Sequence, residues 1–260
     1  MRIAILTSDD AVWALPTWTR TVPALAERHD VAGIVLVPER LGRHTGLAVP
    51  LWYLRTFGLA ATVLLGLHAV LTRLRQRGSW ERLAAAHELD LAHSPSANDP
   101  AVAAWLRERE VDVVFAMVGE ILRAETLSTP RLGMINKHAS VLPSARGVFP
   151  FFWARLEGLP LGLTFHVMDE GVDTGPLLVQ ERCPENDASR SMLGFYAETY
   201  RRYAELAPLA AERLAAGEYL DAPADVAPSH FGFPTRADAR RFRRAGHRVA
   251  RVADLRRVPA

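Results

Sequence analysis

Runs of consecutive apolar residues constrain this chain more than any other feature of its sequence. Residues 2–6, 31–37 and 111–118 are almost wholly apolar, and polar positions do not alternate with the apolar ones. Such continuous runs are typical of strands that are buried on both faces of a sheet. Helical segments separate them, and strands that alternate with helices favour a mostly parallel sheet covered by helices on both sides. The sequence therefore predicts an α/β fold.

The remaining elements follow from the same patterns. Of the 260 residues, 49% are hydrophobic, enough to bury a substantial core. Further short strands are expected at 134–137, 162–167 and 177–180, and helices at 17–28, 51–75, 80–88, 98–110 and 189–216. We expect Pro208 to interrupt the last of these helices and Gly217 to end it. The predicted organisation is a catalytic domain over 1–217 and a short basic extension over 218–260, with a helix at about 235–245.

Charge and cysteine content limit the partners, the covalent cross-links and the cellular compartment that we expect for the protein. Lys and Arg together number 31 against 29 Asp and Glu, a net charge of +2 that does not by itself imply nucleic acid. The single cysteine, Cys183, excludes an internal disulfide and a zinc site made of several cysteines. The first residues lack the pattern of a secretory signal peptide, so we expect a cytoplasmic protein.

An apolar segment within residues 45–75 leaves several interpretations open. Residues 56–72 carry no formal charge but include Gly, Thr and His, and they are short for a membrane span. A buried or partner-facing helix is favoured over an integral membrane helix. Peripheral contact with a membrane surface and a homodimer interface are the alternatives.

The C-terminal extension is rich in arginine between residues 236 and 257. A basic helix there could contact RNA or phosphate. The simpler interpretation is a solvated terminal helix, which makes nucleic acid an unfavoured partner.

Polar residues cluster where several strands are expected to end. In an extended segment, Asn136 and His138 point to the same side, so they can face one cavity. An amide can stabilise a developing oxyanion and an imidazole can manage a proton, which is what acyl transfer requires. The missing carboxylate could come from Asp169, Glu170 or Asp173, in a loop with two glycines that permit close approach.

These residues can also be interpreted as purely structural, or as parts of a site with different chemistry. An Asn-x-His pair at a strand end is also compatible with a turn that simply satisfies the histidine. A nucleophilic serine at Ser140 or Ser144 is disfavoured, because the strand–elbow–helix glycine pattern of the hydrolases is missing. The first strand is followed by Ser8-Asp9-Asp10 rather than a glycine-rich loop, which argues against a nicotinamide enzyme.

Two ordered motifs resemble the folate-dependent formyltransferase family. Asn136-Lys-His138-Ala-Ser140-Val-Leu142-Pro143 with Arg146-Gly147 is similar to the family's Asn-x-His-x-Ser-x-Leu-Pro signature. Thr164-Phe-His166, followed by Asp169 and by Val172-Asp173-Thr-Gly175-Pro176, is similar to its second signature. The resemblance covers about 1–217 and is strongest over 111–182. It implies a Rossmann-like formyltransferase fold.

The resemblance also implies roles for individual residues. Asn136, His138 and Asp173 would be catalytic: Asn136 polarises the formyl oxygen, His138 shuttles protons, and Asp173 bonds to His138 and raises its pKa. The formyl donor would be 10-formyltetrahydrofolate, released as tetrahydrofolate. Its pterin would contact two loops: Met117, Val118, Gly119, Glu120, Ile121 and Leu122 in the first, and Met168, Asp169 and Gly171 in the second. The acceptor amine would be lined by Ser8, Asp9, Asp10, Ser140 and His166, and no metal is expected.

Departures from the family pattern bear on the acceptor. The glycinamide ribonucleotide enzymes carry a Gly-Ser-Asn loop that binds phosphate, whereas Asp9 and Asp10 here would repel it. The methionyl-tRNA enzymes carry a separate C-terminal barrel, which the residues after Gly217 are too few to form. The aromatic segment 146–153 is closer to the N-formyltransferases of amino sugars and natural products. The expected function is N-formylation of a small amine of that kind; methionyl-tRNA formylation, formyltetrahydrofolate deformylation and a membrane-associated binding protein are the alternatives.

Overall fold

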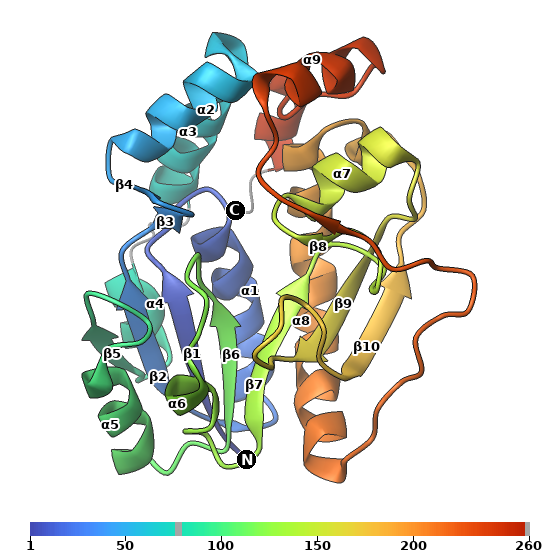
Figure 1. Ribbon diagram of the computed structural model, residues 1–260. Helices are drawn as coiled ribbons and strands as arrows, with labels where there is room; N and C mark the ends of the chain where they lie inside the picture. Colours follow the sequence, from blue (N-terminus) through green and yellow to red (C-terminus); the bar gives the residue numbers. More distant parts are fainter. Residues whose placement is uncertain (76–79, 258–260) are drawn as a thin grey trace.

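A seven-stranded sheet forms the centre of the molecule in the computed structural model, which describes residues 1–75 and 80–257 (Figure 1). Its order is β10-β9-β7-β6-β1-β2-β5. The strands β1, β2, β5, β6 and β7 are mutually parallel, while β9 runs antiparallel to both β7 and β10. The bounds are β1 (Arg2–Ser8), β2 (Asp30–Val37), β5 (Asp90–His93), β6 (Val113–Met117), β7 (Gly133–His138), β9 (Gly162–Val167) and β10 (Leu177–Arg182). This mostly parallel sheet is the Rossmann-like fold that the sequence predicts.

Alternation along β1 shows why both faces of the sheet are covered. Ile3 and Ile5 point into one apolar cluster, while Ala4 and Leu6 point into another on the opposite face. Two long helices cover the first face and pack on each other, and α4 lies with them. The second face is covered by α5, with α6 beside it. These helices are α1 (Ala14–Ala26), α8 (Met192–Ala216), α4 (Trp80–Ala86), α5 (Pro100–Glu108) and α6 (Ala124–Leu127).

A third apolar cluster lies beyond the carboxyl ends of the parallel strands. Figure 1 shows α2, α3, α7 and α9 gathered there, and the cluster is rich in aromatic residues from several of these helices and from α8. The elements are α2 (Ala48–Phe57), α3 (Leu59–Arg75), α7 (Pro150–Glu157) and α9 (Arg236–Arg244), with the two-residue strands β3 (Arg40–Leu41), β4 (His44–Thr45), β8 (Arg146–Gly147) and β11 (His230–Phe231). Two 3₁₀ helices, Ala188–Arg190 and Val252–Arg257, complete the described chain.

Several expected boundaries are wrong. The predicted helix over 51–75 is two helices, because Gly58 has a φ of 90° that no helical residue adopts. Pro208 does not interrupt α8, which runs through it; the proline is buried, and its packing outweighs the backbone hydrogen bond that it removes. The edge strand β5 has no counterpart among the expected strands, and α1 begins at Ala14 rather than near Thr17.

The apolar segment has one buried and one exposed side. In α3, Leu65, His68 and Thr72 are buried, while Leu59, Val63, Leu67, Val70 and Leu74 are exposed. No helix among the described residues is long and apolar enough to cross a bilayer.

The C-terminal segment wraps back over the sheet-bearing part. Parallel pairing of β11 with β8 brings it beside the loop after β7, and Phe242 of α9 stacks on Phe152 of α7 at 4.4 Å. Farther along, fully buried Asp254 accepts a hydrogen bond from the Ser191 hydroxyl at 2.7 Å. Residues 218–257 therefore share contacts with the body of the molecule at several places.

Candidate active site

Neighbouring strands bring the predicted catalytic residues together. Asn136 on β7 lies directly opposite His166 on β9, and Ala116 on β6 is its partner on the other side. His138 follows two residues later on the same face of β7. Asp173 reaches this face from the loop between β9 and β10, with a φ of 52°.

The Asp173 carboxylate is the centre of the cluster. One oxygen, Oδ1, accepts from the Asn136 amide Nδ2 at 3.2 Å, and the other, Oδ2, accepts from the main-chain N–H of Gly147 at 2.8 Å. His138 Nδ1 lies 3.5 Å from Oδ2, and His166 Nε2 lies 3.4 Å from Oδ1. The side chain of Asp173 is only 10% exposed, so these groups replace most of its water.

The protonation of His138 can be worked out from its neighbours. Its Nε2 lies 2.9 Å from the Ala145 carbonyl, which can only accept, so this nitrogen donates. In the neutral ring, Nδ1 then carries a lone pair that faces Asp173. Burial lowers the pKa of His138, although the Asp173 charge opposes that effect. The resting ring is therefore neutral, and Nδ1 is the position that can take a proton with a carboxylate ready to stabilise it.

His166 and Asn136 restrain each other. Nδ1 of His166 is 2.9 Å from the Val167 carbonyl and must donate there, which leaves Nε2 to accept from Asn136 Nδ2 at 3.3 Å. The two amide hydrogens of Asn136 are thus directed at His166 and Asp173. The amide is held in one orientation before any ligand arrives, which is the preorganisation that an oxyanion donor needs.

The charge state of Asp173 follows from its partners. Burial alone would raise the pKa of this carboxyl, but the positive charge that His138 carries when protonated and the hydrogen bond from the Gly147 N–H hold the pKa well below its usual range. Asp173 is therefore ionised at neutral pH. Asp173 raises the pKa of His138, as the sequence predicts. Burial lowers that pKa by more, so the pKa of His138 lies below its ordinary value.

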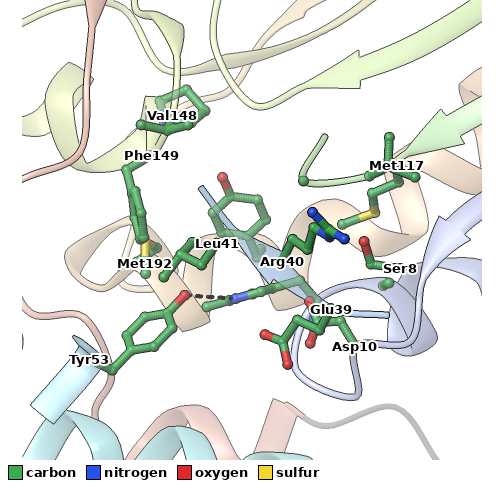
Figure 2. Close-up of a pocket in the computed structure, with 16 residues that line it drawn as sticks. Ser8, Asp10, Glu39, Arg40, Leu41, Tyr53, Met117, Val148, Phe149 and Met192 are labelled. Atoms are coloured by element: carbon green, nitrogen blue, oxygen red, sulfur yellow. Dashed lines mark hydrogen bonds between the residues drawn. The ribbon is translucent and has the colours of Figure 1, made fainter. Parts of the chain in front are cut away.

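A pocket of about 280 Å³ adjoins this cluster. Met117, next along β6 from the strand partner of Asn136, lines it, and so does Val148, next to the Gly147 that binds Asp173. Figure 2 shows the side chains of Tyr53, Phe149 and Met192 on one side of it, with Glu39 and Asp10 nearby. Ser8, Asp10, Met117, Val118 and Gly119, all named from sequence, are among its lining residues.

The other predicted acceptor residues lie elsewhere. Asp9 accepts a hydrogen bond from Trp80 Nε1 at 2.9 Å and is not part of the pocket lining. Ser140 is fully buried and donates to the Ser144 carbonyl at 2.7 Å, while the Ser144 hydroxyl donates to Val141. Both serine hydroxyls are thus used to hold the turn after β7. His166 belongs to the Asp173 cluster.

The two loops predicted to hold the pterin flank the ends of β6 and β9. In the first, Glu120 accepts from the Ser96 hydroxyl at 2.6 Å, Leu122 is buried, and Ile121 is 77% exposed. In the second, Asp169 accepts from Gly171 N and from the Thr174 hydroxyl, and Met168 packs against the core. Within the described residues, the N–H groups of 119–122 have no protein acceptor, and neither do those of 169–174 apart from Gly171. Free main-chain donors beside exposed apolar side chains fit a flat, polar-edged ring.

Some residues of the site lie outside every sequence motif. Glu39, Trp13, Tyr53 and Tyr196 line the pocket but come from four separate segments that share no pattern. Lys137 is different, because it lies within the first motif; it sits on the opposite face of β7 from Asn136, with its ammonium 3.9 Å from the Tyr203 ring. Burial lowers the pKa of Lys137 to about 7. Alternation along β7 could have placed Lys137 behind the site, but nothing local points to the others.

Within the part of the chain that the structure describes, no group of three or more His, Cys, Asp or Glu residues could hold a metal ion. The residues Asn136, His138, His166 and Asp173 contact one another through hydrogen bonds and charge contacts. The cluster combines a fixed amide donor, a neutral imidazole and a carboxylate beside one pocket. That set can stabilise negative charge on an oxygen and move a proton close to it.

Residues 68–192 match the family described as formyl transferase, and all four cluster residues lie within that match. Methionyl-tRNA formyltransferase of Synechococcus sp. (strain JA-3-3Ab) is 39% identical over 129 residues, which are 49% of this chain and 40% of that protein. Its counterpart from Deinococcus radiodurans is 46% identical over 84 residues, 32% of this chain and 26% of that protein. The chain thus spans less than half the length of these curated relatives.

Solved formyltransferases share the fold. The sugar N-formyltransferase from Shewanella sp. FDAARGOS_354 has a TM-score of 0.56 at 17% identity, covering 90% of this chain and 77% of that one. Glycinamide ribonucleotide transformylase 1 from Symbiobacterium toebii has a TM-score of 0.58 at 18% identity, covering 84% and 88%. The fold is the Rossmann-like formyltransferase fold, and the segment that carries the cluster matches the formyl transferase family.

Proposed function

We propose that this protein is a folate-dependent N-formyltransferase that moves a formyl group from 10-formyltetrahydrofolate to the amine of a small acceptor. One observation carries the proposal: Asn136 and His138 on β7 and Asp173 in the loop between β9 and β10 come together, with Asn136 hydrogen-bonded to Asp173 at 3.2 Å and His138 Nδ1 3.5 Å from the same carboxylate. Met117 and Val148, which adjoin this cluster along the chain or the sheet, line a pocket. The match of residues 68–192 to the formyl transferase family supports the same chemistry.

The donor, when bound, supplies a formyl carbon that is open to attack by an amine. The Asn136 amide would exchange its hydrogen bond to His166 Nε2 for one to the formyl oxygen, and it would stabilise the negative charge that develops there while Asp173 keeps hold of its other hydrogen. His138 would take the proton of the attacking amine at Nδ1, where the adjacent Asp173 carboxylate stabilises the imidazolium, and would return it to the folate nitrogen as that nitrogen's bond to the formyl carbon breaks. Asp173 also fixes the Asn136 amide and the Gly147 N–H, so one carboxylate positions both sides of the reaction centre. The free N–H groups of 119–122 and 169–174 bind the edges of the pterin.

The test is an acceptor screen with the purified protein and 10-formyltetrahydrofolate. Product formation is followed by mass spectrometry as the gain of one formyl group on the acceptor, and tetrahydrofolate release is measured in parallel. We expect both in equal amounts. Release of formate and tetrahydrofolate without any acceptor would instead identify a deformylase, which shares the donor site but transfers to water.

Methionyl-tRNA formylation is the second candidate, because the curated relatives with 39% and 46% identity carry that name. An acceptor of this kind needs cationic contacts to phosphates, and α9 exposes several arginines. Binding of tRNA through them should weaken steeply as salt rises. Formylation of a small amine should be nearly indifferent to salt, which separates the two candidates.

A further inference from the structure

The pocket beside the catalytic cluster has an aromatic and aliphatic wall assembled from distant segments. Trp13 precedes α1, Tyr53 belongs to α2, Phe149 precedes α7, and Met192 and Tyr196 lie in the first turns of α8. Trp13 and Tyr196 are 5.1 Å apart between ring centroids, and the Trp13 indole N–H donates to the Tyr53 hydroxyl at 3.4 Å. The wall is therefore made of rings that hold one another in place, suited to an apolar or aromatic body.

Two carboxylates face the same pocket. Asp10 follows β1 and is 8% exposed; its Oδ1 accepts from the N–H groups of Val12 and Trp13 at 2.7 and 3.2 Å. Glu39 follows β2, and within the described residues its carboxylate makes no hydrogen bond and no salt bridge. Burial raises the pKa of Asp10 to about 6 and that of Glu39 to about 7, and neighbouring carboxylates add to the rise in both.

Positive charge near these carboxylates is already engaged or lies outside the pocket. Arg40 is the one cationic side chain among the described lining residues, and its Nε lies 3.4 Å from Glu120. The charge of Asp10 raises the pKa of Lys137, but the Lys137 ammonium lies over the Tyr203 ring. The charge of Arg73, which is exposed on α3, lowers the pKa of Glu39. Asp9 adds further negative charge near both. A phosphate in this pocket would meet uncompensated carboxylates, whereas an ammonium would neutralise them.

We infer that the acceptor enters the pocket as a cationic amine carried on an apolar or aromatic body, without a phosphate group, held by Asp10 and Glu39 against the rings of Trp13, Tyr53 and Phe149. Its ammonium group loses one proton to the surrounding water before the neutral amine attacks the formyl carbon. This inference rests on the proposed function in taking the pocket as the acceptor site. It distinguishes the acceptor of this protein from acceptors that are recognised through a nucleotide, a ribonucleotide or an RNA. A volume of about 280 Å³ limits the enclosed part to one or two rings.

The first experiment measures binding without any folate. Tryptamine is titrated into the protein and followed by calorimetry, beside tryptophol as its uncharged counterpart and O-phosphoethanolamine as a phosphorylated amine. We expect tryptamine to bind and the other two to bind at least tenfold more weakly. Equal binding of tryptophol, better binding of the phosphorylated amine, or no binding of tryptamine would each overturn the inference.

Variants then test whether the carboxylates of Glu39 and Asp10 bind the ammonium group. Glu39→Gln and Asp10→Asn should each weaken tryptamine binding at least tenfold, while leaving the weak binding of tryptophol unchanged. Asparagine can accept the same bonds from Val12 and Trp13, so the turn at residue 10 is kept, and circular dichroism checks folding. Glu27→Gln, which removes an exposed carboxylate at the end of α1, is the matched control and should bind as the wild type does. Unchanged tryptamine affinity in both pocket variants would overturn the inference.

Formyl transfer is measured separately on the same variants with any acceptor that the screen yields. A large rise in KM with little change in kcat is expected for Glu39→Gln. If product forms but KM does not move, the acceptor class is wrong while the function stands. If no acceptor is formylated, yet tryptamine binding depends on Glu39, the pocket assignment stands and the proposed function fails.

Discussion

Asp173 does several jobs through two oxygen atoms. It fixes the Asn136 amide, accepts the Gly147 N–H, and faces both His138 and His166. The alternation of side chains along a strand is enough to pair Asn136 with His138 from the sequence alone. The choice of Asp173 over Asp169 and Glu170 depends on the family resemblance, because position in a loop does not tell which carboxylate turns inward.

Replacing Asp173 by asparagine should destabilise the fold in a pH-dependent way. The pKa of Asp173 is depressed below 3.8 in the folded chain, so its stabilising contribution is present above that pH and is lost as pH falls toward the folded value. We expect Asp173→Asn to cost about 1–3 kcal/mol near neutral pH and less at about pH 3. Urea unfolding of both proteins at the two pH values measures the difference; an equal cost at both would contradict the assignment.

The pocket shows where residue-level prediction stops. Ser8 and Asp10 are predictable because they follow a buried strand at the carboxyl edge of the sheet. Glu39 also follows a buried strand, but it lies in a segment that reads as an ordinary loop, and Tyr53 belongs to a helix whose sequence indicates only that it is apolar. Their proximity is a product of tertiary packing around α2, which no local pattern records.

At the scale of elements, the continuous apolar runs predict the central strands well. The missed strand, β5, has polar residues at both ends and pairs with only one neighbour, so it lacks the signature of a strand buried on both faces. Two predictions about helix continuity are wrong in opposite directions: a helix predicted to continue breaks at Gly58, and a helix predicted to be interrupted at Pro208 continues. In each case local propensity alone does not contain the tertiary contacts that decide whether a helix continues.

Two glycines should respond oppositely to the same substitution. A Cβ on Gly33, in β2, would lie 2.4 Å from the Asp90 carbonyl and 3.0 Å from the Trp105 ring, so Gly33→Ala forces β5 away and should cost about 1–3 kcal/mol. Gly66, within α3, has nothing within 4 Å of its Cβ position, so Gly66→Ala should stabilise by about 0.5–1 kcal/mol. Denaturant unfolding of both variants checks the signs. A neutral Gly33→Ala would show that β5 is not tightly paired.

At the scale of the molecule, the segment after Gly217 reaches the loop that follows β7. Ser229 accepts at its carbonyl from Arg146 N at 3.0 Å and at its hydroxyl from Ala145 N at 2.8 Å, next to the Gly147 that binds Asp173. Phe231 stacks on Trp153 at 4.8 Å between ring centroids. The sequence suggests a basic appendage, because the arginines dominate its composition while the two aromatic anchors, Phe231 and Phe242, are easily overlooked.

Loss of one anchor should therefore lower the stability of the entire chain. Phe242→Ala removes a fully packed ring between α9 and α7, and we expect a loss of about 3–5 kcal/mol in one cooperative transition. Thermal unfolding followed by circular dichroism and by tryptophan fluorescence should give the same midpoint. Two separate transitions, with only the smaller one shifted, would show that 218–260 unfolds independently of 1–217.

The central claim is that Asn136 supplies the hydrogen bond on which formyl transfer depends. The most direct measurement is the turnover of Asn136→Ala with 10-formyltetrahydrofolate and a formylated acceptor, beside Asn186→Ala as a matched loss of an amide remote from the site. We predict that kcat falls about 10²–10³-fold in Asn136→Ala, that folate binding stays measurable, and that Asn186→Ala turns over normally. Near-normal turnover by a folded Asn136→Ala protein would contradict the account.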